Sequence, residues 1–293
     1  MSFNHMCQMM AHRYIFKPPK RPQPQDHRKE ANERFVRSID GDDIHCKLVL
    51  RFDYPSTIET YERNRNGVIL ASHGNADDVA SFHSYAQFLA DRCQMSVVVY
   101  DYPGYGFSSG DLCTTDANMF TACEAALRFV MDTLKHPVED ITVLGKSIGT
   151  VPAVQLASQP YMAQCNGLVL ISPLASGARC MIDASYYQHI PTAIMTSMDL
   201  IFGPSVHRIS EVQTLVFVTH GQHDTIVPIS NAHALLAHCA TSSYYPPLFV
   251  EAGHNDIESK FTGLFASSLV DFIAAARDRQ RARSDYQGTT DAA

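Results

Sequence analysis

The sequence predicts an α/β fold, in which a mostly parallel central sheet of about eight strands carries helices on both faces and a short cap. Three observations lead to this prediction. Short runs that are apolar at nearly every residue match strands buried on both faces; they span residues 66–73, 95–102, 141–147, 167–173, 214–220 and 246–252. Longer segments with helical periodicity separate several of these runs. An alternating stretch ahead of them adds an antiparallel hairpin.

The helical and alternating segments are justified by their spacing. Residues 116–134 place apolar side chains at helical spacing, and Asp116 is the expected cap. Residues 257–276 repeat that spacing before the end of the chain. Residues 34–53 alternate apolar and polar side chains on either side of Gly41, which predicts a hairpin at the edge of the sheet.

These elements divide the chain into three parts. Residues 1–34 form a proline-rich, basic leader for which we expect little regular structure, and residues 35–278 form the α/β domain. Within that domain the segment 174–210 is apolar and irregular. Loops of this length inside a compact domain are usually functional, so we interpret it as a short cap over a pocket. Residues 279–293 form a polar tail.

Composition excludes several classes of protein. Acidic residues outnumber basic ones by 30 to 23, which argues against a nucleic-acid partner. The eight cysteines are scattered without a CxxC pair, so we interpret them as reduced thiols rather than as disulfides or a zinc site. No apolar stretch approaches the roughly 18 residues of a membrane span, and the start of the chain lacks the continuous apolar segment of a secretory signal. We therefore expect a cytoplasmic protein. A transit peptide is the alternative, because no acidic residue precedes Asp26. The sequence carries no signal of oligomeric state.

The basic leader leaves two alternatives open. In one, it lies across the surface of the domain. In the other, it makes a peripheral contact with an anionic membrane, through lipidation of Cys7 and through the basic side chains of Lys17, Lys20, Arg21, Arg28 and Lys29.

The stretch GKSIG at residues 145–149 fits the pattern G-x-S-x-G between a predicted strand and a predicted helix. In that context Ser147 is held in a tight elbow at the end of the strand, where its hydroxyl can act as a nucleophile. Gly145 and Gly149 are expected because a Cβ beside the elbow would clash with the neighbouring strand and helix. The alternative is a glycine-lined turn without catalytic function.

A serine nucleophile needs a base and an acid that orients the base. Asp224 follows the strand at 214–220, and His254 follows the strand at 246–252, so the chain order is Ser, Asp, His. Because the carboxyl ends of parallel strands meet at one edge of the sheet, we expect Ser147, Asp224 and His254 to converge there.

Other residues compete for these roles among the fourteen histidines and the nearby acids. His220 and His223 precede Asp224 and so break the chain order of acid then base. Asp256 is expected to cap the last helix together with Asn255 rather than to serve as the acid.

An oxyanion hole normally needs two backbone N–H groups. We expect one from Ile148, directly after the nucleophile, and one from Asn75 in the stretch SHGNADD, where Gly74 allows a sharp turn. The alternative is a plain strand–helix turn capped by acidic residues. The glycine-rich stretch at 100–110 lacks the G-x-G-x-x-G spacing of a nucleotide site, and we expect neither a cofactor nor a metal.

Five stretches together, SHGNADD, YDYPGYGFSSG, GKSIGTVPAVQLAS, SPLASGAR and EAGHNDIE, resemble the α/β-hydrolase superfamily. They are most similar to its subfamily-seventeen α/β-hydrolase-domain proteins, the protein depalmitoylases, over about residues 35–275. The resemblance implies an eight-stranded hydrolase fold and hydrolysis of the thioester that links palmitate to cysteine. It also assigns nucleophile, acid and base to Ser147, Asp224 and His254.

Two features depart from that family. The relatives carry an N-terminal cluster of cysteines, whereas this chain has only Cys7 there. Lys146 stands where the family usually has glutamine, and it either alters the choice of substrate or faces solvent.

We therefore expect a serine hydrolase that acts on acyl thioesters and esters through an acyl-enzyme, with an S-acylated protein as the expected substrate. A carboxylesterase or lipase and a serine peptidase are alternatives, because the same triad serves all of them. A hydrolase-fold scaffold without activity is the remaining alternative.

Overall fold

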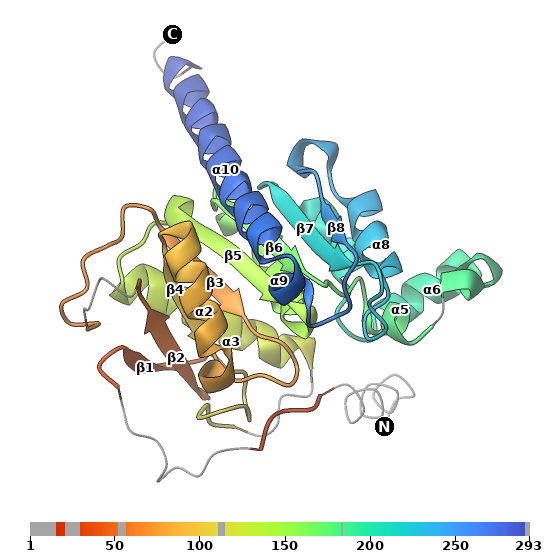
Figure 1. Ribbon diagram of the computed structural model, residues 1–293, viewed down its shortest axis with the longest axis horizontal. Helices are drawn as coiled ribbons and strands as arrows, with labels where there is room; N and C mark the ends of the chain where they lie inside the picture. Colours follow the sequence, from red (N-terminus) through yellow and green to blue (C-terminus); the bar gives the residue numbers. More distant parts are fainter. Residues whose placement is uncertain (1–15, 21–29, 52–56, 111–114, 183, 291–293) are drawn as a thin grey trace.

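The computed structural model describes residues 16–20, 30–51, 57–110, 115–182 and 184–290. Within these ranges the chain forms one eight-stranded sheet of order β1-β2-β4-β3-β5-β6-β7-β8 (Figure 1). The strands are β1 (Glu33–Arg37), β2 (Asp43–Val49), β3 (Val68–Ser72), β4 (Ser96–Tyr100), β5 (Ile141–Lys146), β6 (Gly167–Ile171), β7 (Val216–Gly221) and β8 (Leu248–Val250). Six of them match the apolar runs of the sequence.

The pairing of the strands confirms the predicted fold class. β1 pairs with β2 and β2 with β4 in antiparallel fashion, whereas every pair from β4 through β3 to β8 is parallel. Gly41, with a φ of +92°, turns the chain between β1 and β2, as the hairpin prediction required. The parallel strands thus place their carboxyl ends along one edge.

Helices cover both faces of this sheet. They are α2 (Val79–Cys93), α3 (Asp116–Arg128), α4 (Thr150–Ala157), α5 (Gly177–Met181), α6 (Thr192–Asp199), α7 (Ser205–Arg208), α8 (Ser230–His238), α9 (Ile257–Lys260) and α10 (Thr262–Thr290). α2, α9 and α10 pack on one face, and α3, α4, α7 and α8 on the other (Figure 1).

The two cores explain why the strands are apolar throughout. In β3, Val68 and Leu70 enter one core, while Ile69 and Ala71 enter the other, because successive side chains of a strand point to opposite faces. A strand buried on both sides has no solvent-facing position to fill with polar residues.

Three helix predictions need correction. The cap of α3 is Thr115 rather than Asp116, since the Thr115 hydroxyl accepts the Asn118 N–H at 3.0 Å. The helix predicted over 257–276 is broken, because α9 ends at Lys260 and α10 starts at Thr262.

The third correction concerns Asp256, which was expected to cap the last helix. Asp256 stands before α9 but makes no capping hydrogen bond to the helix; its Oδ1 accepts the Gly253 N–H at 2.6 Å instead. The backbone of α10 continues as helix through Thr290, well into the polar tail. None of the helices in the described ranges combines the length and the apolar character needed to span a bilayer.

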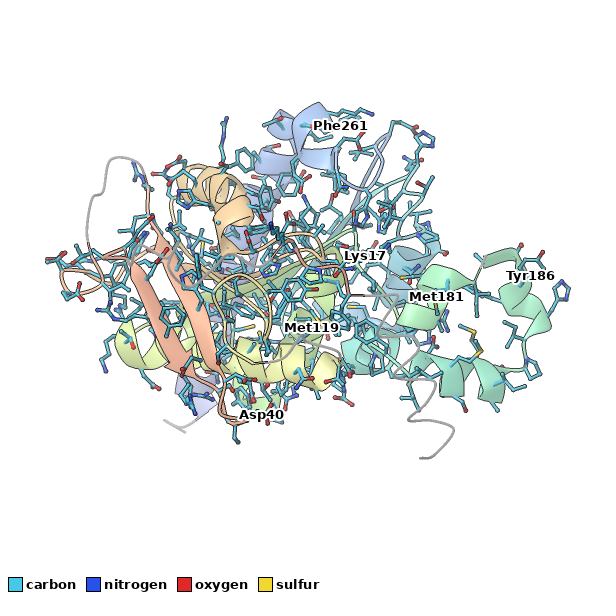
Figure 2. All side chains as sticks on the ribbon, turned by 90° about the horizontal axis from the view of Figure 1, so that it is seen from below. Lys17, Asp40, Met119, Met181, Tyr186 and Phe261 are labelled. Carbon is cyan, nitrogen blue, oxygen red and sulfur yellow. The ribbon has the colours of Figure 1, made fainter. Side chains whose placement is uncertain are left out.

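The segment 174–210 carries α5, α6 and α7, and α5 and α6 extend away from the sheet as an arm (Figure 1). Asp199 is buried at its base, where it accepts hydrogen bonds from the Ser176 hydroxyl at 2.6 Å and the Arg179 guanidinium at 2.9 Å. Met181 and Tyr186 are both exposed, and Tyr186 lies toward the outer end of the arm (Figure 2).

A short piece of the leader contacts the domain. Phe16 is buried and packs edge-on against Phe202 of the segment 174–210, with ring centroids 5.5 Å apart. The Lys17 N–H donates to Asn75 Oδ1 at 2.9 Å. Residues 16–20 therefore lie against the body of the protein, while Cys7, Arg21, Arg28 and Lys29 lie outside the described residues.

Candidate active site

Ser147 stands at the carboxyl end of β5, in the turn that leads into α4. Its φ of +54° lies in the left-handed region, which a non-glycine residue adopts only when the surroundings enforce it. A Cβ on Gly145 would lie 2.5 Å from the Gly149 carbonyl oxygen, and one on Gly149 would lie 2.2 Å from the Ser72 carbonyl oxygen. Both glycines are thus required by close backbone approach, as the elbow prediction supposed.

The structure brings the three predicted side chains together. The Ser147 hydroxyl lies 2.9 Å from His254 Nε2, and His254 Nδ1 lies 2.6 Å from Asp224 Oδ2. Asp224 follows β7 and His254 follows β8, so both arrive from neighbouring strand ends. This is the hydrogen-bond geometry of a nucleophile, its base and an orienting acid.

Asp224 is held as a carboxylate. Its Oδ1 accepts the N–H groups of Ile226 at 2.9 Å and Val227 at 2.8 Å. Burial opposes its ionisation, but hydrogen bonds from His220 and His254 outweigh burial and hold the pKa of Asp224 well below its ordinary value. The ionised carboxylate fixes the proton of His254 on Nδ1, which leaves Nε2 free to accept the serine proton.

His220 supports this acid from behind. Its Nε2 lies 3.2 Å from Asp224 Oδ2 and 2.8 Å from the Val227 carbonyl oxygen, and its side chain is fully buried. The chain order argued against His220 as the base, but it did not reveal the contact between His220 and Asp224. The spacing of four residues between His220 and Asp224 was the available signal. His223, the other rival, is exposed and pairs with Glu251.

The loop 72–78 lies beside the serine. A Cβ built on Gly74 would lie 4.0 Å from Ser147 Cβ. The Asn75 side chain is fixed there, because its Oδ1 accepts the Tyr105 hydroxyl at 2.9 Å in addition to the Lys17 N–H. Asp78 caps α2 by accepting the Ser81 N–H at 2.8 Å, so the loop is also a capped strand–helix turn. Sequence reasoning missed Tyr105, since the glycine-rich stretch 100–110 was considered as a nucleotide site and was set aside.

Lys146 is paired. Its Nζ lies 2.8 Å from Glu258 Oε1 and 4.8 Å from the centroid of the Tyr85 ring. The side chains of Lys146 and Glu258 are 15% and 12% exposed, so the expectation that Lys146 simply faces solvent is wrong.

A hollow of about 220 Å³ adjoins the elbow on this side. Its lining is polar and aromatic and consists of Asp77, Ser81, Phe82, Tyr85, Lys146, Asn255, Glu258 and Ser259. Two of these residues, Lys146 and Asn255, directly adjoin Ser147 and His254 in the chain.

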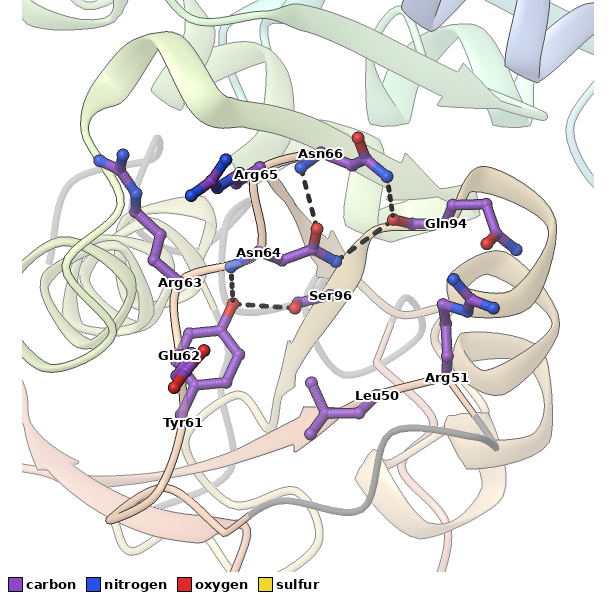
Figure 3. Close-up of a pocket in the computed structure, with 10 residues that line it drawn as sticks. All are labelled: Leu50, Arg51, Tyr61, Glu62, Arg63, Asn64, Arg65, Asn66, Gln94 and Ser96. Atoms are coloured by element: carbon purple, nitrogen blue, oxygen red, sulfur yellow. Dashed lines mark hydrogen bonds between the residues drawn. The ribbon is translucent and has the colours of Figure 1, made fainter.

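A second hollow, of about 240 Å³, lies near the opposite ends of β3 and β4 (Figure 3). Its polar groups are largely bonded to one another: the Tyr61 hydroxyl lies 2.8 Å from Ser96 Oγ, and the amides of Asn64 and Asn66 both donate to the Gln94 carbonyl oxygen. These bonds hold a loop in place, and the hollow is separate from the candidate site.

Neither a metal cluster nor a disulfide is found in the part of the chain that the structure describes, where the cysteines are free thiols.

Comparisons with known proteins bear on the family and the fold of this chain. A family model for the alpha/beta hydrolase fold matches residues 67–186. The human alpha/beta hydrolase domain-containing protein 17B is 32% identical over 248 residues, which cover 84% of this chain and 76% of that protein. Protein 17C of Xenopus tropicalis is 36% identical over 191 residues, which cover 65% of this chain. The chain spans little more than half of that relative, 56% of its length.

A solved structure shows the same fold. An esterase from Pyrococcus furiosus superposes with a TM-score of 0.65 at 17% identity, over 89% of this chain and 98% of the esterase. At this identity the likeness concerns the fold and not the substrate.

Proposed function

The chain belongs to the α/β-hydrolase family and, within it, to the group of alpha/beta hydrolase domain-containing proteins 17. From this membership and the geometry of the site we propose that the protein is a serine hydrolase of acyl thioesters and esters. The observation that carries the proposal is the continuous line of hydrogen bonds from Ser147 through His254 to Asp224. An intact line of this kind argues against the alternative of an inactive scaffold.

In the proposed reaction, His254 Nε2 takes the proton of the Ser147 hydroxyl while Oγ attacks the carbonyl carbon of the substrate. The tetrahedral intermediate collapses as His254 returns that proton to the leaving sulfur or oxygen, and an acyl-enzyme remains. Water, activated by His254, then releases the acid and restores the serine. Asp224 stays ionised throughout and balances the charge of the imidazolium.

The oxyanion of each intermediate needs donors, and we assign them to the backbone N–H groups of Ile148 and Asn75. Gly74 lies against Ser147, and the Asn75 side chain is tied to Tyr105, which supports a fixed position for this loop. Donors of this kind contribute roughly 3–4 kcal/mol each to the stabilisation of the transition state in related chemistry.

Within this class we favour a protein palmitoyl thioesterase. The resemblance to the depalmitoylases supports this choice, and so does the apolar content of the segment 174–210, where Phe202 and Met195 are buried. A carboxylesterase or lipase is the second candidate, supported by the shared fold of the archaeal esterase. A serine peptidase has no specific observation in its favour.

We further propose a cytoplasmic location with peripheral contact to membranes. Free thiols in the described residues suit a reducing compartment. Because residues 16–20 lie on the domain, we assign a membrane contact to the other residues of the leader. The proposed reaction requires no cofactor, no metal and no nucleic acid.

A side-by-side assay tests the proposed function. The purified protein and its Ser147→Ala variant are offered a palmitoyl thioester, a short-chain ester and a peptide amide. We expect the wild type to cleave the thioester fastest and the variant to be inactive. Cleavage of the ester alone would assign a carboxylesterase, and cleavage of the amide alone a peptidase. Inactivity of folded wild type toward all three would favour the scaffold.

A further inference from the structure

The two sides of Ser147 differ in chemical character. On one side lies the segment 174–210, whose buried Phe202 packs with Phe16 in the apolar core. On the other side lies the hollow of about 220 Å³ between α2, the end of β5 and α9. A substrate whose carbonyl carbon sits at Ser147 extends to both sides, since its acyl chain and its leaving group depart from that carbon in different directions.

The hollow is unsuited to an acyl chain. Two carboxylates, a lysine, an amide and three hydroxyls line it beside the rings of Phe82 and Tyr85, and an alkyl chain placed there would desolvate these polar groups without offering hydrogen bonds. The leaving group of an S-acylated protein is a cysteine within a peptide, which does offer polar and charged groups. The hollow therefore fits the leaving-group side of the substrate.

The charges of the hollow have a definite balance. Lys146 and Glu258 form an ion pair and neutralise each other. Asp77 remains, and one of its carboxylate oxygens lies 2.9 Å from the position that a Cβ on Gly74 would take, close to the nucleophile. No basic side chain among the described residues forms an ion pair with Asp77. The hollow thus carries a net charge of about −1 at neutral pH.

We propose that this hollow is a subsite for the leaving-group peptide and that Asp77 selects a basic residue next to the acylated cysteine. The inference rests on the proposed thioesterase function and sharpens it. The same charge disfavours anionic leaving groups. Lys146 also affects the selection, because its positive charge compensates the negative charge of Glu258, the second carboxylate of the hollow.

Peptides that differ in a single residue test the subsite. S-palmitoyl-cysteine peptides carry Lys, Ala or Glu beside the cysteine, and kcat/KM is measured for each at low and at high ionic strength. For the wild type we expect the Lys peptide to exceed the Glu peptide about tenfold at low salt, from attraction in one and repulsion in the other, with a smaller ratio at high salt.

Two variants must move this ratio in opposite directions. Asp77→Asn removes the selecting charge and brings the Lys-to-Glu ratio toward about 1. Lys146→Gln leaves Glu258 unpaired, adds a negative charge to the hollow and raises the ratio above that of the wild type. Asp271→Asn, the same kind of change at an exposed position of α10, is the matched control and keeps the wild-type ratio. Thermal melting establishes that each variant is folded.

A wild-type ratio near 1 overturns the proposal, and so does a ratio that neither Asp77→Asn nor Lys146→Gln changes. Binding of the same peptides to Ser147→Ala, followed by fluorescence anisotropy, decides the matter without catalysis. If no peptide is cleaved but the Lys peptide still binds more tightly in a manner that depends on Asp77, the subsite stands and the thioesterase function fails. If binding ignores charge, the subsite fails.

Discussion

Two buried aspartates of this protein stand in similar surroundings, but the histidines beside them have different neighbours. Asp224 lies between His254 and His220, and backbone N–H groups hold its other oxygen. Asp101, at the end of β4, lies between His45, at 3.0 Å, and His73, at 3.6 Å. It too accepts a backbone N–H, from Val79 at 2.8 Å.

The difference is what lies beyond the histidine. His254 reaches the Ser147 hydroxyl, and its side chain is 8% exposed at the edge of the site. The side chains of His45 and His73 are 3% and 0% exposed, and His73 Nδ1 lies 2.8 Å from the Gly74 carbonyl oxygen. Asp101 therefore ties β2, β4 and the loop beside the serine together. On the proposed function, the comparison teaches that a histidine–carboxylate pair can serve catalysis only where a hydroxyl and an entry for substrate adjoin it.

The largest effects are expected at the two aspartates, where one variant should lose activity and the other should lose stability. Asp224→Asn should lower kcat about 10⁴-fold with little loss of stability, because the amide no longer holds His254 in the productive tautomer. Asp101→Asn should lower the free energy of unfolding by about 3 kcal/mol while kcat of the folded protein falls far less. Steady-state kinetics and urea unfolding of both variants measure this split. Equal losses of kcat in the two variants would erase the distinction.

A smaller effect concerns His220. His220→Ala should lower kcat about tenfold, because Asp224 keeps two backbone donors but loses a side-chain neighbour that orients it. The pH profile of kcat between about pH 6 and 9 should keep its shape, since Asp224 stays ionised there. His220→Gln restores a donor near the same place and should recover part of the activity. A changed profile would contradict a purely positioning role for His220.

The pH dependence of the unfolding free energy tests the structural role of Asp101. Burial opposes the ionisation of Asp101, but hydrogen bonds and charges from His45 and His73 win and lower its pKa to about 2. A lowered folded-state pKa gives stability that is complete above the unfolded pKa of about 3.9 and is lost as the pH falls toward 2. Wild type should lose roughly 2–3 kcal/mol more than Asp101→Asn between about pH 5 and pH 2 in urea unfolding. Parallel curves would contradict this.

The smallest effect is expected at a third histidine–carboxylate pair. His223 and Glu251 form an ion pair on the surface, where their side chains are 69% and 64% exposed. Glu251→Gln should change kcat/KM by less than about twofold, because solvent screens such a pair. A large loss of activity would return His223 to consideration as a catalytic base.

Much of the fold and of the candidate site could be predicted because local patterns determine them. Runs that are apolar throughout identify buried strands, and the order Ser, Asp, His identifies Ser147, Asp224 and His254 without knowledge of their distances. The elbow glycines follow from backbone crowding alone.

The rest depends on contacts between distant segments. The packing of Phe16 on Phe202, the bond from Tyr105 to Asn75 and the pair Lys146–Glu258 join residues that share no local pattern. Thr115 and Asp116 are both acceptable caps by type, and only the geometry of the first turn decides between them.

The central claim is that Ser147 is an activated nucleophile, and a fluorophosphonate probe tests it most directly. The probe labels a serine only where a base and an oxyanion hole activate it. Labelling of the wild type at Ser147, located by mass spectrometry and absent in Ser147→Ala, is the result we expect. Folded wild type that stays unlabelled, or that is labelled at another serine, would contradict the account.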